Sequence, residues 1–310
     1  MATTHAAALT RTFRPAYELD LRLTLGQLQR GHSDPTYRVA ADGAVWRSAR
    51  TPDGPCSLRI TARRDTGEVT GEAWGPGAAW QLDRLPALLG ADDDPAAFPS
   101  HHHPQIHDAF RSRRGLRMPR TGLVLAALIP SILEQKVTTI EARKAFRLLV
   151  LWYGEPAPGP APDGLRVIPD AATWSRIPTW DWHRAGVDHK RSRTIMEALR
   201  VAPALERTAP LANAEASRLL KCVPGIGVWT TAETMQRSHG DPDALSVGDL
   251  HLAKQVCYAL TGTPGDDARM LDLLEPYRGH RHRAALLLRM TGPRTPRRAP
   301  RFAPRDYSRI

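Results

Sequence analysis

The chain has 310 residues, enough to bury a substantial core and to hold two or three packed units. Its 43 lysine and arginine residues outnumber its 32 aspartate and glutamate residues, and the formal net charge of +11 fits a polyanionic partner. The three cysteines form no CxxC pair, which argues against a disulfide framework, a zinc ribbon or a four-cysteine iron–sulfur cluster. The longest apolar stretch, residues 123–133, is short and interrupted by a proline, so we expect no membrane segment and a cytoplasmic protein.

Residues 1–95 are predicted to form a small antiparallel β-sheet domain. Apolar and polar residues alternate strictly from Tyr17 to Leu25, a pattern typical of a half-buried strand. Further strands are predicted at 44–50, 56–63 and 67–74. Turn-forming residues separate them, at Asp42-Gly43 and again at 65–67.

From residue 96 the periodicity changes to that of helices, and the fold class predicted for the whole chain is therefore α+β. We expect a helical body over residues 96–291, with a proline-rich loop at 155–164. The predicted helices cover 105–113, 122–135, 138–153, 170–176, 188–202, 213–223, 228–239, 249–260, 266–275 and 280–290. Residues 292–310 combine arginines with prolines and lack a core pattern, so they are predicted to be a disordered basic tail that either contacts a nucleic-acid backbone or serves only solubility.

A tight turn between two of these helices has the character of an anion site. The first helix ends at Pro224, and Gly225 and Gly227 permit backbone conformations that other residues avoid. A second helix begins near Val228. Backbone amides at the start of this helix have no intrahelical acceptor, and beside the positive end of the helix dipole they suit a phosphate oxygen.

A carboxylate follows this second helix. Asp249 stands at the predicted start of the next helix, where an aspartate commonly caps the backbone amides and contributes roughly 0.5–2 kcal/mol. On this position alone, capping is a sufficient explanation of the residue.

Together the two features resemble a known family. The pattern L-x-x-x-P-G-I-G-x-W-T, with an aspartate twenty residues after the tryptophan, resembles the helix-hairpin-helix DNA glycosylases and within them the 3-methyladenine DNA glycosylase II branch. The similarity continues at 130–138, which looks like the family's I-L-x-Q-x-x-S/T helix, at 186–191, and at Tyr277-x-x-His280-Arg281-x-x-Ala284. These pieces occur in family order over about residues 95–290. The resemblance implies a β-rich N-terminal domain, a monomer, and duplex DNA with damaged bases as the partner.

The resemblance gives Asp249 a second role. Hydrolysis of an N-glycosidic bond develops positive charge on the sugar, and a carboxylate beside that charge stabilises the transition state. Bifunctional relatives place a nucleophilic lysine two residues after the second hairpin glycine, where this chain has Trp229. A monofunctional enzyme that leaves the abasic strand intact is therefore expected.

Three residues are predicted to line the pocket for a flipped base: Trp229, Glu233 and His280. Related proteins commonly have aromatic residues at the last two positions. Glu233 has three open interpretations: it attracts a cationic alkylated purine, it protonates a leaving base if its pKa is raised, or it forms an ion pair with a neighbouring arginine.

The remaining predicted contacts are with the DNA strand. Gly225, Gly227, Val228 and Thr230 belong to the hairpin, and the hairpin carbonyls at 224–229 can hold a monovalent cation in related proteins; no other cofactor and no metal site is expected. Lys136 occupies the position of the residue that wedges into the gap left by the flipped base. Gln135, Lys190 and Arg281 match family positions that contact the strand or support the pocket, with ordinary surface or packing roles as the alternative.

The sequence thus predicts a monofunctional DNA N-glycosylase that excises alkylated purines of the 3-methyladenine or 7-methylguanine type in base-excision repair. The alternative is a noncatalytic helix-hairpin-helix protein that binds DNA but whose base pocket has diverged. Asp249 favours the enzyme, since a binding protein needs the hairpin but no carboxylate at that point.

Overall fold

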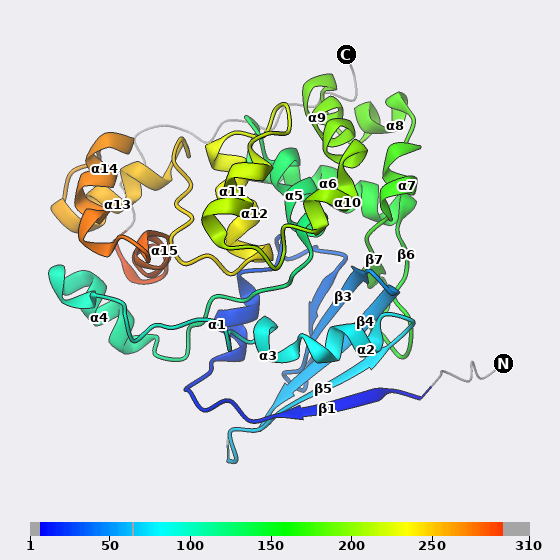
Figure 1. Cartoon of the computed structure of the whole chain (residues 1–310), viewed down its shortest axis with the longest axis horizontal. Helices are drawn as coiled ribbons and strands as arrows, with labels where there is room; N and C mark the ends of the chain where they lie inside the picture. Colours follow the sequence, from blue (N-terminus) through cyan, green and yellow to red (C-terminus); the bar gives the residue numbers. More distant parts are fainter. Residues whose placement is uncertain (1–6, 64, 294–310) are drawn as a thin grey trace.

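The N-terminal part of the chain forms a five-stranded antiparallel sheet (Figure 1). The computed structural model describes residues 7–63 and 65–293; most of the predicted basic tail, from residue 294 onward, lies outside this range. The strand order is β1-β5-β4-β3-β2. The predicted strands are confirmed as β3 (Val45–Thr51), β4 (Gly54–Ala62) and β5 (Val69–Trp74), while β1 (Leu9–Phe13) and the short β2 (Tyr37–Val39) were not predicted.

The strand predicted at residues 17–25 is wrong. Residues Leu21–Gly26 form the short helix α1, in which Thr24 and Leu25 are buried. The side chain of Asp20 accepts a hydrogen bond from the amide of Leu23 at 2.9 Å and so caps this helix. A local helix cap therefore overrides the alternating pattern.

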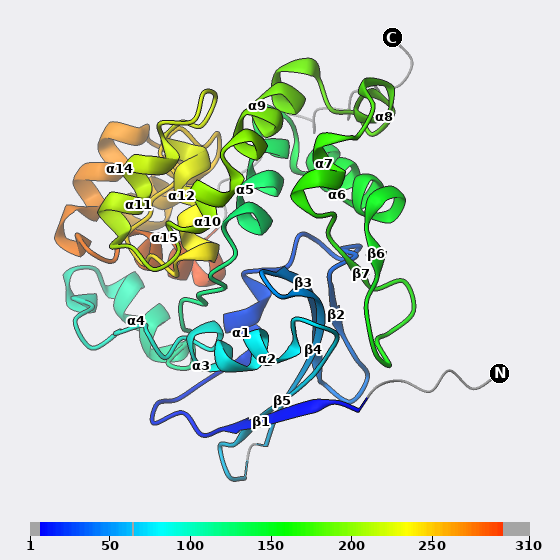
Figure 2. The same cartoon turned by 45° about the vertical axis from the view of Figure 1, so that its right-hand side comes forward.

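Two short helices cover one face of the sheet (Figure 2). They are α2 (Ala78–Asp83) and α3 (Leu85–Leu88), and their leucines share a buried core with Leu58 and Ile60 of β4. Gly71 of β5 permits this close approach, because a Cβ atom there would lie 2.9 Å from the side chain of Leu85.

Helices form the rest of the described chain, which confirms the α+β fold class. They are α4 (Pro104–Ser112), α5 (Val124–Leu133), α6 (Thr139–Tyr153), α7 (Ala171–Ser175), α8 (Thr179–Arg184), α9 (His189–Arg200), α10 (Ala202–Glu206), α11 (Asn213–Leu220), α12 (Val228–Ser238), α13 (Leu252–Thr261), α14 (Asp267–Leu274) and α15 (Arg281–Thr291). The helix predicted from residue 249 begins at Leu252 instead. A short two-stranded ladder closes the proline-rich loop, with β6 (Glu155–Pro156) at its start and β7 (Arg166–Val167) just after it. None of the helices described is long and apolar enough to cross a membrane.

The helical body has two hydrophobic cores. One surrounds α5, α6 and α9, and the other joins α4 with α13, α14 and α15, the group at the left of Figure 1. Val223 and Ile226, which flank the predicted hairpin turn, are buried in the first core together with Met235 of α12. The turn is therefore anchored from inside by apolar side chains, while its glycines remain at the surface.

The three cysteines are free thiols that differ in exposure. Cys56 and Cys257 are buried, and burial raises the pKa of both thiols, that of Cys56 to about 12. Cys222 is exposed and lies two residues before Pro224, at the start of the hairpin turn.

Candidate DNA-binding and catalytic site

The two hairpin glycines serve different purposes. Gly225 has a left-handed backbone (φ +88°), and a Cβ atom there would lie 2.4 Å from the Thr194 hydroxyl oxygen of α9. The protein itself therefore requires glycine at 225. Gly227 has an ordinary φ of −96°, and a Cβ atom there would meet no protein atom within 4 Å. Packing does not require glycine at 227, which leaves its backbone open to an external group.

The N-terminus of α12, which begins beside Gly227, also lacks a protein partner for its amides among the described residues. Gly227 is its N-cap and provides no side-chain cap, so the amides of the first turn lack an intrahelical acceptor. Val228, the first residue of the helix, is 56% exposed. This geometry suits an anion and supports the predicted role of Gly227 and Val228 as backbone contacts for a phosphate.

Gln135 joins the loop after α5 to the hairpin. Its side-chain amide donates to the carbonyl of Gly225 at 3.0 Å and to the hydroxyl of Thr230 at 2.8 Å. The supporting role among its predicted alternatives is thus the one seen. Thr230 is buried and its hydroxyl accepts a hydrogen bond from Gln135, so the DNA contact predicted for Thr230 stays a prediction that would involve its backbone amide.

Two exposed lysines lie beside the hairpin. Lys136 follows Gln135 and, among the described residues, is the non-glycine residue with a positive φ (+55°). Such a conformation is sparsely populated for residues other than glycine and is retained where the surroundings dictate it. Lys190 is exposed in the first turn of α9, the helix whose Thr194 abuts Gly225. Both positions allow the predicted DNA contacts.

Asp249 is held by both of its carboxylate oxygens. Oδ1 accepts hydrogen bonds from the amides of His251 at 2.8 Å and Leu252 at 2.9 Å, which is the capping role. Oδ2 accepts a hydrogen bond from the indole nitrogen of Trp229 at 3.1 Å. The side chain is half-buried, in a turn that Gly248 (φ +86°) makes possible. The structure thus brings the predicted carboxylate to the first turn of α12, beside the open helix end.

Glu233 does not line an open pocket. It is 9% exposed; its Oε2 accepts from Arg237 at 2.8 Å and its Oε1 from the hydroxyl of Ser246 at 2.6 Å. Burial alone would raise the pKa of Glu233, but the charge of Arg237, the hydrogen bond from Ser246 and the charge of Arg30 outweigh burial and bring it to about 2. The general-acid hypothesis, which needs a raised pKa, is therefore not supported, and the contacts of Glu233 match the ion-pair interpretation.

The pair of Glu233 and Arg237 also restrains the loop that leads to Asp249. The hydroxyl of Ser246, three residues before Asp249, donates a hydrogen bond to Glu233 and accepts one from the side-chain amide of Gln236 at 2.9 Å. Gln236 also donates to the carbonyl of Ala244 at 2.8 Å. Glu233 therefore positions the Asp249 loop from below the surface.

His280 and Arg281, the two predicted site residues at the start of α15, contact residues outside the Asp249 site. His280 packs against Phe98, with ring centroids 5.7 Å apart. It also lines a cavity of about 320 Å³ together with Asp92 and Asp94. Burial and the nearby Arg283 lower the pKa of His280. Among the described residues none of its hydrogen bonds or ring contacts involves Trp229 or Asp249, so the predicted pocket role is not supported.

The side chain of Arg281 forms an ion pair within the protein. Its Nε lies 2.8 Å from Oδ1 of Asp243, which also accepts from the backbone amides of Gly279 and Arg281. The packing alternative therefore describes Arg281, and the direct DNA contact predicted for it is not supported.

Arg30 contributes to this region and was not predicted from the sequence. It precedes β2 in the chain, and its guanidinium Nη1 donates to both oxygens of Glu134, at 3.0 and 3.1 Å. Its positive charge also helps to lower the pKa of Glu233. No local pattern marks Arg30, because its partners lie about a hundred and two hundred residues further along the chain.

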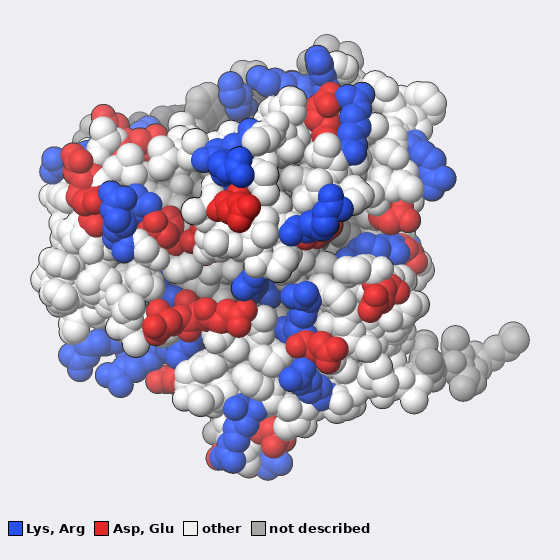
Figure 3. All heavy atoms as spheres, viewed as in Figure 1, with Lys and Arg blue, Asp and Glu red and all other residues white. Residues whose placement is uncertain are grey.

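Charge is not gathered into one patch on the face of the molecule seen in Figure 3. Basic and acidic side chains are interspersed there. Several arginines of the described chain are paired, among them Arg120 with Asp92, Arg237 with Glu233 and Arg278 with Glu275. The open helix end and the exposed lysines therefore mark the candidate interface better than the net charge does.

The chain has the fold of several solved DNA glycosylases. The chain superposes on the 3-methyladenine DNA glycosylase of Archaeoglobus fulgidus with a TM-score of 0.74 and 15% identity, covering 90% of this chain and 96% of that one. It also superposes on the 8-oxoguanine glycosylase/lyase of Clostridium acetobutylicum in complex with double-stranded DNA, with a TM-score of 0.67 and 12% identity over 92% of this chain and 97% of that one. At these identities the match shows the fold.

A sequence relative supports the same resemblance. The Mycobacterium tuberculosis protein named "Probable bifunctional transcriptional activator/DNA repair enzyme AlkA" is 30% identical over 175 residues, which are 54% of this chain and 34% of the relative. The chain thus spans about a third of the length of the curated relatives it matches. No family model matches the chain. Fold and sequence together confirm the resemblance to the helix-hairpin-helix DNA glycosylases that the motifs predicted.

Proposed function

We propose that this protein is a monofunctional DNA N-glycosylase that flips alkylated purines, of the 3-methyladenine or 7-methylguanine type, out of duplex DNA and excises them. The observation that carries the proposal is the position of Asp249. Its carboxylate is half-buried, held by Trp229 and by the amides that begin α13, and it lies beside the open N-terminus of α12.

This arrangement suits hydrolysis at a sugar. The bond between C1′ and the base nitrogen breaks with its electron pair going to the base, a water oxygen bonds to C1′ and releases one proton to the solvent, and the base leaves. Positive charge develops on the sugar, and the negative charge of Asp249 stabilises it. A phosphate bound at the first turn of α12 would place the sugar of a flipped nucleotide close to this carboxylate.

The proposed substrate needs no general acid. A purine alkylated at N3 or N7 carries a positive charge in the nucleotide and leaves as a neutral base, without a proton from an acid. Glu233, with a pKa of about 2, is ionised at neutral pH and serves as no acid. The proposed reaction requires no cofactor.

The proposed absence of strand cleavage rests on Trp229. Bifunctional relatives form a Schiff base with a lysine at this position, and an indole cannot do so. The Clostridium acetobutylicum protein of the same fold is named a glycosylase/lyase, so the point needs its own test. Borohydride treatment during the reaction should trap no covalent protein–DNA complex; a trapped complex would contradict the monofunctional assignment.

The first experiment compares wild type with Asp249→Asn. Release of free base from methylated duplex DNA is measured together with duplex binding at one fixed salt concentration. We expect release by wild type and a loss of at least about 100-fold in the variant, with binding and folding retained, because asparagine also caps helices. Equal release by both proteins would refute the role of Asp249.

One observation favours a second candidate, a noncatalytic DNA-binding protein. Glu233 and Arg237 fill part of the α12 face with an ion pair where related proteins have an aromatic pocket residue. This candidate predicts salt-dependent duplex binding without release of any base. Deaminated and oxidised substrates decide the matter: binding with no release from these or from methylated DNA would establish it.

A further inference from the structure

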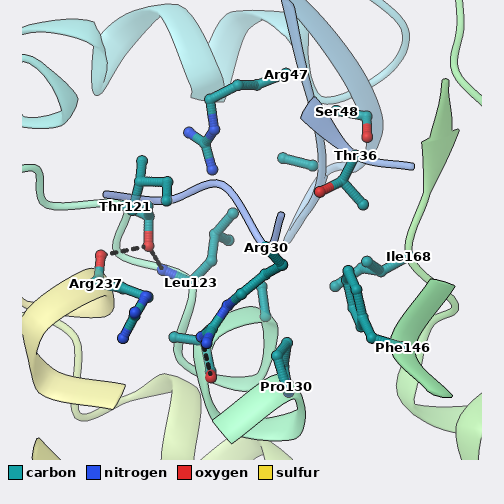
Figure 4. A pocket seen from close by; sticks show the side chains of 14 residues that line it. Arg30, Thr36, Arg47, Ser48, Thr121, Leu123, Pro130, Phe146, Ile168 and Arg237 are labelled. Atoms are coloured by element: carbon teal, nitrogen blue, oxygen red, sulfur yellow. Dashed lines mark hydrogen bonds between the residues drawn. The ribbon is translucent and has the colours of Figure 1, made fainter. Parts of the chain in front are cut away.

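A small cavity lies between the sheet and the helical body (Figure 4). We call it the sheet–helix cavity. Its volume is about 50 Å³, and its walls are mostly apolar, with Ala49 of β3 on one side and Ala127, Pro130 and Phe146 of α5 and α6 on the other. Neither Trp229 nor Asp249 lines it, and the inference drawn from it does not depend on the proposed function.

Three arginines among the described residues line this cavity, and two of them have carboxylate partners. Arg30 is paired with Glu134, at 3.0 Å, and Arg237 with Glu233, at 2.8 Å. Arg47 of β3 is different. Within the described residues no carboxylate oxygen lies within 4.0 Å of its guanidinium, and the guanidinium donates no hydrogen bond.

Figure 4 shows Arg47 reaching from β3 toward Thr121, on the opposite wall of the cavity. Asp34 is the carboxylate whose charge acts on Arg47. The oxygens of Asp34, however, already accept from the amide of Arg30 at 2.6 Å and from the amide and hydroxyl of Thr36 at 2.8 and 2.7 Å. The donors of Arg47 are therefore directed into the cavity without a protein acceptor.

Arg237, which also lines the cavity, has one donor without an acceptor among the described residues, although that donor does not face the cavity. The Nε atom of Arg237 is buried and has no hydrogen-bond partner. Removing a guanidinium charge from water is costly even in part, and an arginine remains protonated, so it cannot avoid the cost by losing its proton. Arg47 is half-buried, and this burial lowers the pKa of its guanidinium. A bound anion would offset this cost.

The size and donors of the cavity define the ligand. One water needs roughly 10–15 Å³ of such space, so about 50 Å³ holds a few waters or one small ion but no nucleobase. The planar fork of an arginine matches two oxygens of a tetrahedral oxyanion. We propose that the sheet–helix cavity binds a small inorganic oxyanion of the phosphate class through Arg47, and that this anion stabilises the packing of the sheet on the helical body.

The test compares thermal unfolding of the full chain in phosphate and in chloride at equal ionic strength. The variant is Arg47→Met, which removes the charge and keeps much of the side-chain length. The matched control is Arg63→Met, because Arg63 is in the sheet domain, 64% exposed and paired with Asp65. Arg47→Lys, which keeps the charge without the planar fork, is a second variant.

Two results are expected. In chloride, Arg47→Met is at least as stable as wild type, since an unpaired, half-buried charge has been removed. In phosphate, the Tm of wild type and of Arg63→Met rises saturably, by about 2 °C or more, beyond any rise in Arg47→Met, and Arg47→Lys shows a smaller rise than wild type. Phosphate at the exposed end of α12 would affect all four proteins equally, so the difference between wild type and Arg47→Met isolates the cavity.

Three outcomes would overturn the proposal. One is an equal phosphate response in wild type and Arg47→Met, which would place the anion elsewhere. Another is a chloride response as large as the phosphate response, which would exclude an oxyanion site. The third is no response of wild type to phosphate up to tens of millimolar. If Arg47→Met does not fold, the comparison of wild type with Arg47→Lys and Arg63→Met decides the same question.

Discussion

The first turn of α12 and the middle of the same helix differ in how their polar groups are satisfied. At the first turn Gly227 has open space around it and Val228 is exposed, and the helix has no side-chain cap. One turn later Glu233 is buried, and both of its oxygens accept hydrogen bonds. Polar groups with protein partners stabilise the fold, whereas those without are available to a ligand.

The comparison distinguishes two carboxylates whose roles the sequence alone did not separate. Asp249 and Glu233 both lie near Trp229, and both were candidates for chemistry. Asp249 is half-buried at the surface, whereas Glu233 is held in an ion pair beneath it. The difference predicts that changes at Asp249 affect activity and changes at Glu233 affect stability.

The largest expected effect is acid destabilisation of the buried region. Burial lowers the pKa of His282 to about 3 from its usual 6.5, and the pKa of Glu233 is about 2 instead of 4.5. In both cases the unfolded chain binds a proton first. The free energy of unfolding should therefore fall as pH drops, below 6.5 through His282 and below 4.5 through Glu233, by roughly 6 kcal/mol between pH 7 and pH 3. Denaturant titrations at a series of pH values measure this fall, and a flat profile would contradict it.

Next in size is the effect of Glu233→Gln. The substitution leaves the guanidinium of Arg237 buried without its counter-charge, so we expect a loss of about 3 kcal/mol in the free energy of unfolding. The matched control is Asp249→Asn, which should change stability by less than about 1 kcal/mol because the cap is kept. Urea unfolding of both variants provides the measurement. Equal losses in the two variants would remove the distinction between the two carboxylates.

A smaller effect is expected from Trp229→Phe. The ring is retained, but the hydrogen bond to Oδ2 of Asp249 is lost, and such a bond to a charged group is worth about 1.5–3 kcal/mol. Base release should slow by about 10- to 100-fold in kcat, with KM and duplex binding little changed. Trp180→Phe on α8 is the control, since Trp180 is 71% exposed and lies outside the site. A change in KM alone would show that Trp229 only contacts the base.

The smallest expected effect on stability distinguishes the two hairpin glycines. Gly227→Ala should leave the free energy of unfolding within about 1 kcal/mol of wild type, because no atom obstructs the new Cβ and φ is ordinary. The same change should weaken duplex binding several-fold, because the new methyl group blocks the close approach of a DNA phosphate to the protein backbone. Gly225→Ala should destabilise the protein by more than about 1 kcal/mol, through its left-handed backbone and its contact with Thr194. Fluorescence anisotropy with labelled duplex measures binding. Unchanged binding by Gly227→Ala would argue against a phosphate at this turn.

Features encoded by neighbouring residues could be predicted from the sequence. The hairpin follows from a proline and two glycines at fixed spacing between apolar positions, and the structure shows it between α11 and α12. The capping role of Asp249 likewise depends on the backbone amides two and three residues later, and it is seen. The α+β fold class follows from the change of periodicity near residue 96.

Features that depend on distant partners could not be predicted. The burial of Glu233 beneath Ser246 and the pairing of Arg281 with Asp243 depend on contacts that only the tertiary fold makes. Arg237, four residues after Glu233 on the same helix, is a local partner, and the ion pair was among the interpretations that the sequence left open. The alternation at residues 17–25 indicated a strand, but the cap at Asp20 and the hydrogen bond from its amide to the carbonyl of Gly115, at 2.7 Å, favour helix α1. The division into domains at residues 95 and 96 stays a prediction.

The exposure of the cysteines gives the protein a natural labelling site. A maleimide reacts with an accessible thiolate, and the thiols of Cys56 and Cys257 are buried with raised pKa values, whereas that of Cys222 is exposed. The unaltered chain should therefore take up one dye, at Cys222, beside the hairpin turn. Emission from that dye would report the arrival and departure of a duplex in real time, so the kinetics of binding can be followed without introducing or removing a single cysteine.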